Sequence, residues 1–164
     1  MTATLPQVSI EHHERLMHQV DRMPAVGDLI GSAPPSELRP KVDELSGFLT
    51  GLLLPHMDAA EQALYPELER LLQNRHSMTP MRGEHAEIRR LVAELGRFQG
   101  MVDDGRLSTG DAVALRRVIF RLYALLKVHL AEEQLYLGII EKGASPESAD
   151  ALAAAMEHAG TSEF

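Results

Sequence analysis

The sequence predicts an all-α protein, an antiparallel up-down-up-down four-helix bundle with a short C-terminal fifth helix. Apolar residues recur at three- and four-residue steps through most of the 164 residues, and β-branched residues are sparse. Residues that interrupt helices fall at intervals of about one long helix. Because the connections between these segments are short, neighbouring helices are expected to run antiparallel.

The first two expected helices contain internal prolines. The first spans about residues 7–30, and Pro24 inside it predicts a kink. The second begins at a Ser36 cap and continues to about residue 73. Pro55 and Pro66 interrupt this second helix, so its hydrogen bonding is expected to be irregular there.

The remaining helices have recognisable starts. Thr79 as N-cap and Pro80 at the first helical position open the third, which ends at the turn of residues 103–105. The fourth, residues 108–142, opens on a capping-box-like sequence. A short fifth helix from about residue 145 to 158 completes the chain.

Composition limits the classes of partner. The 24 acidic and 16 basic residues give a net charge of −8, and Lys and Arg cluster only in pairs, which argues against nucleic acid or a membrane surface as partner. The chain shows neither a targeting signal nor an apolar run that could cross a bilayer, so a cytoplasmic protein is expected, and no protein partner is indicated. We expect a single domain over residues 1–164, with the bundle at about 7–142 and an extension at 143–164.

Histidine placement predicts a metal site. The chain has no cysteine, so any metal must be bound by nitrogen and oxygen atoms. His13, His56, His85 and His129 each lie within a different expected helix, on its apolar stripe. A lone histidine there is usually a satisfied core residue, but four on four helices favour a site built between facing helices.

Two glutamates accompany these histidines at different spacings. Glu133 follows His129 by four residues, so both side chains project from one helix face. Glu61 follows His56 by five residues, about 140° around an ideal helix, and the two would not converge on one ion. A π-type turn beside Pro55 would bring them together, and otherwise Glu61 would bridge from the side.

Four further residues are alternatives at this site. His12 adjoins His13 and would face the metal if the first helix were rotated, and Glu132 is a substitute for Glu133. Tyr65 and Tyr136 are expected in the core or beside the site, with a phenol that reaches the metal as the alternative.

Four segments together resemble a known family. They are EHHERL at residues 11–16, PHMDAAEQALYP at 55–66, MRGEH at 81–85 and HLAEE at 129–133. The combination is similar to the hemerythrin-like, or HHE cation-binding, domain over about residues 7–142. The resemblance implies a four-helix bundle around two non-haem iron ions, bridged by two carboxylates and an oxo or hydroxo oxygen. By position, it implies these metal ligands: His13, His56, Glu61, His85, His129 and Glu133.

The chain departs from the family pattern at two points. Oxygen-carrying members have a second histidine one turn before the third-helix ligand, where this chain has Met81, which argues against reversible oxygen carriage. The five-residue spacing from His56 to Glu61 is the second departure. With four imidazoles, two carboxylates and one bridging oxygen, about ten of roughly twelve iron coordination positions would be filled, and about two would stay open.

Open positions on iron suggest a function. We expect a di-iron protein that binds, senses or turns over O2, H2O2 or NO in oxidative or nitrosative stress; if it is an enzyme, it is a di-iron oxidoreductase. The alternative is a regulatory or interaction module in which iron occupancy controls folding or partner binding. Zinc would fit the same ligand types.

Overall fold

The computed structural model describes the backbone of residues 5–160 and the side chains of residues 11–155. Within that part of the chain, the regular elements are all helical and none is a strand, so the all-α prediction is confirmed. None of the helices in the described part of the chain combines the length and the apolar character needed to cross a membrane.

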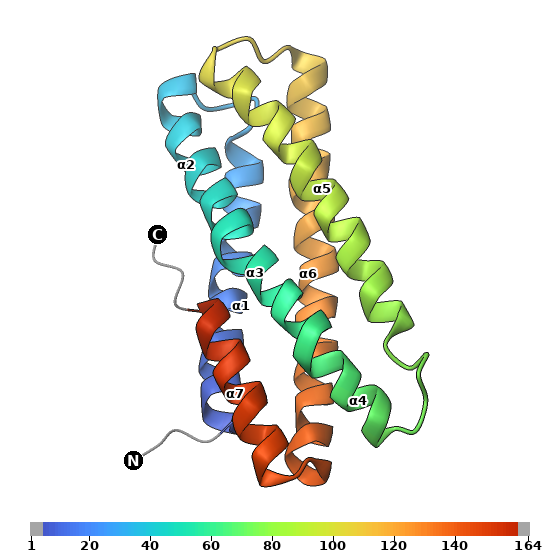
Figure 1. Ribbon diagram of the computed structural model, residues 1–164. Helices are drawn as coiled ribbons and strands as arrows, with labels where there is room; N and C mark the ends of the chain where they lie inside the picture. Colours follow the sequence, from blue (N-terminus) through green and yellow to red (C-terminus); the bar gives the residue numbers. More distant parts are fainter. Residues whose placement is uncertain (1–4, 161–164) are drawn as a thin grey trace.

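Long helical segments lie side by side along one axis (Figure 1). The first is α1, Leu5–Leu29, and the second comprises α2, Pro35–Phe48, α3, Leu54–Ala59, and α4, Tyr65–Leu71. α5, Thr79–Asp103, and α6, Thr109–Gly143, follow, and α7, Pro146–Gly160, packs against α1 and α3. Successive long segments run in alternating directions in Figure 1.

Two π-helical turns interrupt the second segment. They are η1, Leu49–Leu53, and η2, Ala60–Leu64, and each lies directly before a helix whose second residue is a proline, Pro55 or Pro66. A proline has no N–H to donate and its ring crowds the preceding turn, so a widened turn before it relieves both problems. The predicted irregularity near Pro55 is confirmed.

The helix starts agree with the sequence in part. Ser108 and Asp111 form the predicted capping box of α6, and Ser145 Oγ accepts a hydrogen bond from the Ser148 backbone near the start of α7. The Thr79 prediction was wrong, because α5 already includes Thr79 and its N-cap is Met78, which makes no side-chain capping bond. The Ser36 prediction was also wrong, since α2 begins at Pro35; a proline in the first turn needs no partner for its nitrogen. α1 continues through Pro24.

The interior consists of two apolar clusters with a polar layer between them. The larger cluster joins α1, α2, α5 and α6 and includes Ile88, Leu126 and Leu130. The smaller surrounds α4 and the C-terminal half of α6 and includes Tyr65 and Leu137. Along α5, His85 falls between Met81 of the smaller cluster and Ile88 of the larger one. Along α6, Glu133 falls between Leu130 of the larger cluster and Leu137 of the smaller one, so apolar packing lies on both sides of the site.

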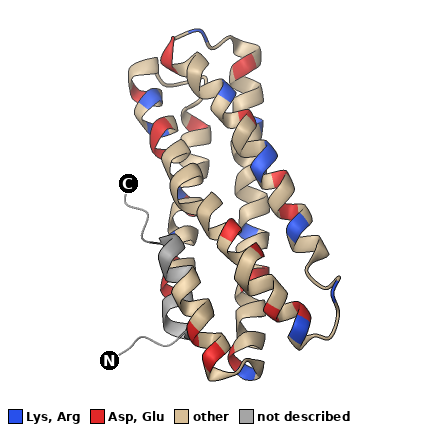
Figure 2. Ribbon diagram, viewed as in Figure 1, with Lys and Arg blue, Asp and Glu red and all other residues tan. Residues whose placement is uncertain are grey.

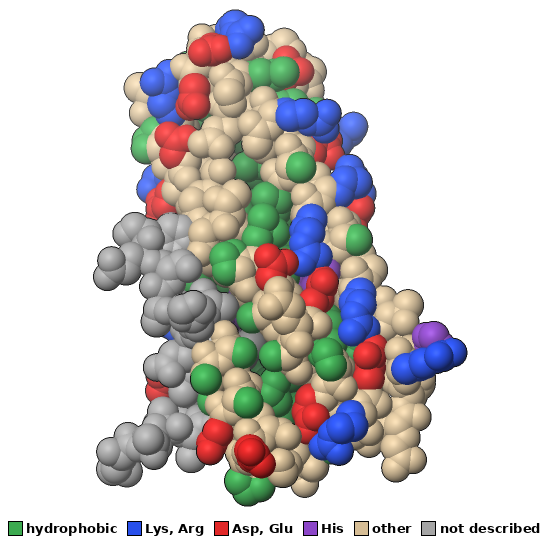
Figure 3. Space-filling view, in the orientation of Figure 1, with side chains coloured by type: hydrophobic (Ala, Val, Ile, Leu, Met, Phe, Trp, Pro, Cys, Tyr) green, Lys and Arg blue, Asp and Glu red, His purple; other side chains and the backbone are tan. Residues whose placement is uncertain are grey.

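The surface carries both charges. Acidic and basic side chains are interspersed along α2 and α5 (Figure 2). On the face shown in Figure 3, hydrophobic side chains gather in a strip between α2–α3 and α5, and charged side chains flank the strip on the α5 side.

Candidate metal centre

Six polar side chains are buried to 5% exposure or less in the described interior: His12, His13, His56, His85, His129 and Glu133. Five of them, all except His12, form two groups with metal-ligand spacing, one of His13, His56 and Glu133 and the other of His85, His129 and Glu133. In each group the potential ligand atoms lie within 4.8 Å of one another. Glu133 belongs to both groups, so the arrangement is that of two adjacent sites sharing one carboxylate.

Each oxygen of Glu133 faces a different set of partners. Oε2 lies 2.7 Å from His56 Nε2 and 3.0 Å from His13 Nε2. Oε1 accepts a hydrogen bond of 3.4 Å from the Tyr65 hydroxyl, which also lies 3.0 Å from His85 Nε2. A carboxylate with its two oxygens turned toward two donor sets can bridge two cations.

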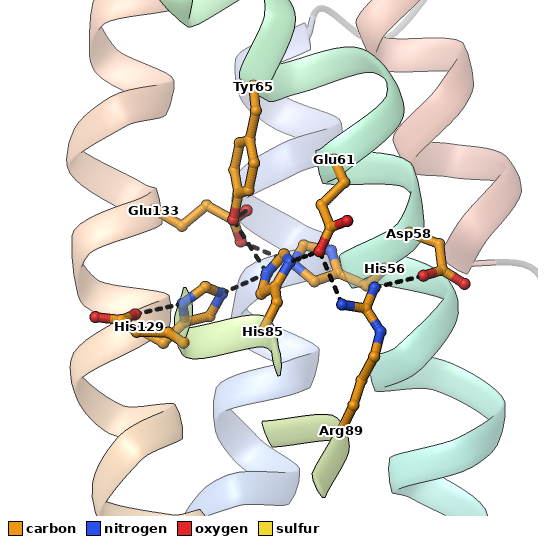
Figure 4. Close-up of polar contacts among 9 residues, drawn as sticks. His56, Asp58, Glu61, Tyr65, His85, Arg89, His129 and Glu133 are labelled. Carbon is orange, nitrogen blue, oxygen red and sulfur yellow. Dashed lines mark hydrogen bonds and ion pairs between the residues drawn. The ribbon is translucent and has the colours of Figure 1, made fainter. Parts of the chain in front are cut away.

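In the group of His85, His129 and Glu133, the hydrogen-bond partners of the two imidazoles leave their inner nitrogens available to a cation. The outer nitrogens of its imidazoles face carboxylates. His85 Nδ1 is 2.6 Å from Glu61 (Figure 4), and His129 Nδ1 is 2.8 Å from Glu84. An ionised carboxylate only accepts, so both Nδ1 atoms carry a ring proton, and in a neutral ring the Nε2 atom then carries a lone pair. These Nε2 atoms face each other at 3.0 Å, and a cation between them would satisfy both.

The protonation of the buried groups agrees with this assignment. Burial, reinforced by His129, lowers the pKa of His85 to about 4. Burial, together with His56 and His13, lowers the pKa of His12 to about 3. Although burial alone would raise it, the neighbouring His56 and His13 hold the pKa of Glu133 well below its usual range. At neutral pH the site therefore contains neutral His85 and His12 rings beside an ionised carboxylate, which are the forms that bind metals.

Glu61 is not in either group. It lies in η2 and its Oε1 accepts hydrogen bonds from His85 Nδ1 at 2.6 Å and from Arg89 at 2.8 Å. Its position is therefore behind the His85 ring, on the side away from Glu133. Burial alone would raise the pKa of Glu61, but the hydrogen bonds from Arg89 and His85 lower it.

Tyr65 lies where the family resemblance implied Glu61. Its hydroxyl points at His85 Nε2 and Glu133, and the side chain is fully buried. The η2 turn changes the helical phase after Ala60, so the residue four positions after Glu61 enters the site. Burial, together with Glu133, raises the pKa of the phenol, so Tyr65 is a neutral donor here.

The remaining alternatives are placed as follows. His12 is buried, with Nε2 at 3.0 Å from the outer nitrogen of His56 and Nδ1 without a hydrogen bond among the described residues. Glu132 is half-buried and in neither group, and Tyr136 packs against the smaller apolar cluster.

Two residues of the site were missed from the sequence. Glu84 precedes His85 directly, and its partner His129 lies on another helix, so helical spacing alone could not reveal the contact. Arg89 follows His85 by four residues on the same face and joins Glu61 to Asp58 (Figure 4). An arginine one turn after a buried histidine was the available signal for this ion pair.

His56 and His85 lie closer to the same level along the bundle axis than the lengths of their helices predict. Counting residues from the connection places His56 one to two turns deeper than His85. In the structure the connection between α4 and α5 climbs back along the molecule before α5 begins (Figure 1). Both histidines therefore lie near the same carboxylate, Glu133. His56 contacts its Oε2 directly, and His85 is linked to its Oε1 through the Tyr65 hydroxyl.

The family model described as the hemerythrin HHE cation binding domain matches residues 8–140. The chain belongs to this family. Neither curated proteins nor solved structures gave a significant match. The resemblance seen in the sequence is thus confirmed, and the matched span contains every histidine and glutamate of the two groups.

Family membership and the geometry of the site both indicate cation binding. The chain is an HHE cation-binding domain, and its buried histidines and Glu133 form two groups able to hold metal.

Proposed function

We propose that this protein is a di-iron hemerythrin-like protein that binds, senses or turns over a small oxidant, namely O2, H2O2 or NO. The antiparallel four-helix bundle would hold one iron between His13 and His56 and the other between His85 and His129, with Glu133 shared. The observation that carries the proposal is the convergence of two histidine pairs on one buried carboxylate. We place this activity in the cytoplasm, as the sequence predicts.

The donor set favours iron over harder cations. Neutral imidazole nitrogens suit zinc, copper, iron and nickel, whereas magnesium and calcium take mainly oxygen ligands. A pair of irons supplies redox chemistry toward small oxidants, and zinc in the same site would not. Redox function therefore depends on which of these metals the histidine pairs bind.

The protein residues around the pair have separable roles. Glu133 links the two halves, and Glu61 and Glu84 orient His85 and His129 from behind. Tyr65 places an O–H donor at the inner side of His85, where it can hydrogen-bond a bound oxygen or nitrogen species or take the place of the missing second carboxylate ligand. Met81, fully buried, lines the neighbouring apolar cluster, so water access from that side is restricted.

A second function has a structural feature in its favour. A regulatory module needs a surface for a partner, and a groove of about 1040 Å³ lies between α1 and α2. Its lining includes the apolar residues Phe48 and Leu52 and the acidic residues Glu11 and Glu14. In that case iron occupancy, sensed through His12 and His13 next to Glu11 and Glu14, would change how α1 packs. Thermal stability and helicity that depend strongly on iron would support this alternative.

The test uses the full chain reconstituted anaerobically with ferrous iron. Optical spectra are recorded after separate additions of O2, H2O2 and NO, and the proposal expects new absorption with at least one of them. His85→Ala should remove this response, whereas His18→Ala, an exposed histidine on α1, should keep it. Spectra that stay unchanged with all three molecules in an iron-loaded protein would contradict the oxidant function.

A further inference from the structure

The imidazoles of His56, His85 and His129 differ in what lies behind them. Behind His85 and His129 lie carboxylates, Glu61 at 2.6 Å and Glu84 at 2.8 Å from the outer nitrogens. Behind His56 lies another imidazole, with His12 Nε2 at 3.0 Å from Nδ1. An anionic acceptor makes an imidazole a stronger ligand for a cation, and a neutral ring does so much less.

We propose that the two halves bind metal unequally, with the His85–His129 half filling first and holding its metal more tightly because Glu61 and Glu84 back its imidazoles. This inference rests on the proposed di-metal function. It makes Glu61 and Glu84 positioning residues, which act on the metal through histidines and do not touch it. The His13–His56 half is then the exchangeable one.

The two carboxylates are not equivalent. The Glu61 oxygen that accepts from His85 also accepts from Arg89 at 2.8 Å, and Arg89 binds Asp58 at 2.6 Å (Figure 4). Arg89 thus holds Glu61 in place but shares its charge. Glu84 is paired with His129 and, among the described residues, with no Lys or Arg. Loss of the Glu84 charge should therefore weaken the first metal more than loss of the Glu61 charge.

Both carboxylates can be changed without disturbing the core. Glu61 is 29% exposed and Glu84 is 24% exposed, so an amide at either position retains access to solvent. Glutamine keeps the shape and one acceptor oxygen but removes the negative charge. The variants Glu61→Gln and Glu84→Gln thus test charge behind the ring, with Glu87→Gln on α5, which pairs with Arg90 and Arg121, as the matched control.

The experiment titrates the metal-free full chain with Co²⁺ in competition with a chelator of known affinity, under anaerobic conditions. The wild type should show two separate binding steps. Glu84→Gln should weaken the first step by about 10- to 100-fold, Glu61→Gln by less, and neither should move the second step. Glu87→Gln should leave both steps unchanged. Circular dichroism of each metal-free variant establishes that it is folded, and Glu84→Asp should restore part of the lost affinity.

The location of the first metal is read from the Co²⁺ absorption spectrum at one equivalent. That spectrum should change in Glu84→Gln and match the wild type in His13→Ala. Equal weakening of both steps in Glu84→Gln, or loss of the first step in His13→Ala, would overturn the inference while leaving the di-metal site intact. A wild-type protein that binds no Co²⁺ would overturn the inference and the proposed function together.

Discussion

Tyr65→Phe removes a single hydroxyl from the centre of the site. In the metal-free protein that hydroxyl can donate its one proton to His85 Nε2 at 3.0 Å or to Glu133 Oε1 at 3.4 Å, and the ring is fully buried. Phenylalanine fills almost the same volume, so the loss is confined to hydrogen bonding. A buried acceptor left unpaired costs about 1–3 kcal/mol, which we expect as the decrease in the free energy of unfolding. For a chain of this size the melting temperature falls by about 2–4 °C per kcal/mol.

The measurement is urea unfolding of the metal-free protein in a chelator, repeated with metal bound. Tyr136→Phe is the control, because the Tyr136 hydroxyl makes no hydrogen bond to the residues that the structure describes. If His85 Nε2 binds metal, its lone pair is satisfied and the decrease should be smaller in the loaded protein. A decrease that grows on loading would instead identify Tyr65 as a ligand. A metal-free Tyr65→Phe protein no less stable than Tyr136→Phe would refute the reasoning.

Three further outcomes follow from the structure. His129→Ala should reduce the metal content from two ions to about one per chain, measured by elemental analysis; an unchanged content would exclude His129 as a ligand. The free energy of unfolding of the metal-free protein should fall by about 3 kcal/mol from His85 alone as the pH drops from about 6.5 to 4. The reason is that the His85 pKa is 6.5 in the unfolded state and about 4 in the folded state, so only the unfolded state binds a proton in this range. A constant free energy of unfolding in urea titrations across this range would contradict the assignment. Gly27→Ala should destabilise the fold by about 1–3 kcal/mol, because the added Cβ would lie 2.7 Å from the Phe120 ring, and the metal content should be unchanged. Equal melting temperatures of the variant and the wild type would refute this close contact between Gly27 and Phe120.

The sequence predicted best where regular helix geometry decides the outcome. His85, His129 and Glu133 lie on apolar stripes of α5 and α6, and a stripe faces the interior of an all-helical fold. The capping box at Ser108 was predicted for the same reason, since its residues are close in sequence. Local spacing sufficed for each of these features.

Prediction reached its limit where spacing is irregular or contacts join different helices. Irregular hydrogen bonding near Pro55 and Pro66 was predicted, with a π-type turn beside Pro55, but the change of helical phase at η2 was not. The entry of Tyr65 into the site and the position of Glu61 behind His85 therefore came only from the structure. Glu84 was missed because its meaning depends on His129, which is 45 residues away. Whether His12 or His13 faces Glu133 depends on the rotation of α1, which the sequence left open and the structure places with His13 toward Glu133.

The central claim is that two cations bind between the histidine pairs of this chain. The most direct measurement is the number of iron ions retained per chain after anaerobic reconstitution with ferrous iron and removal of unbound metal. We expect about two iron ions per chain in the wild type. A count near zero, with helicity and melting temperature the same before and after reconstitution, would contradict it.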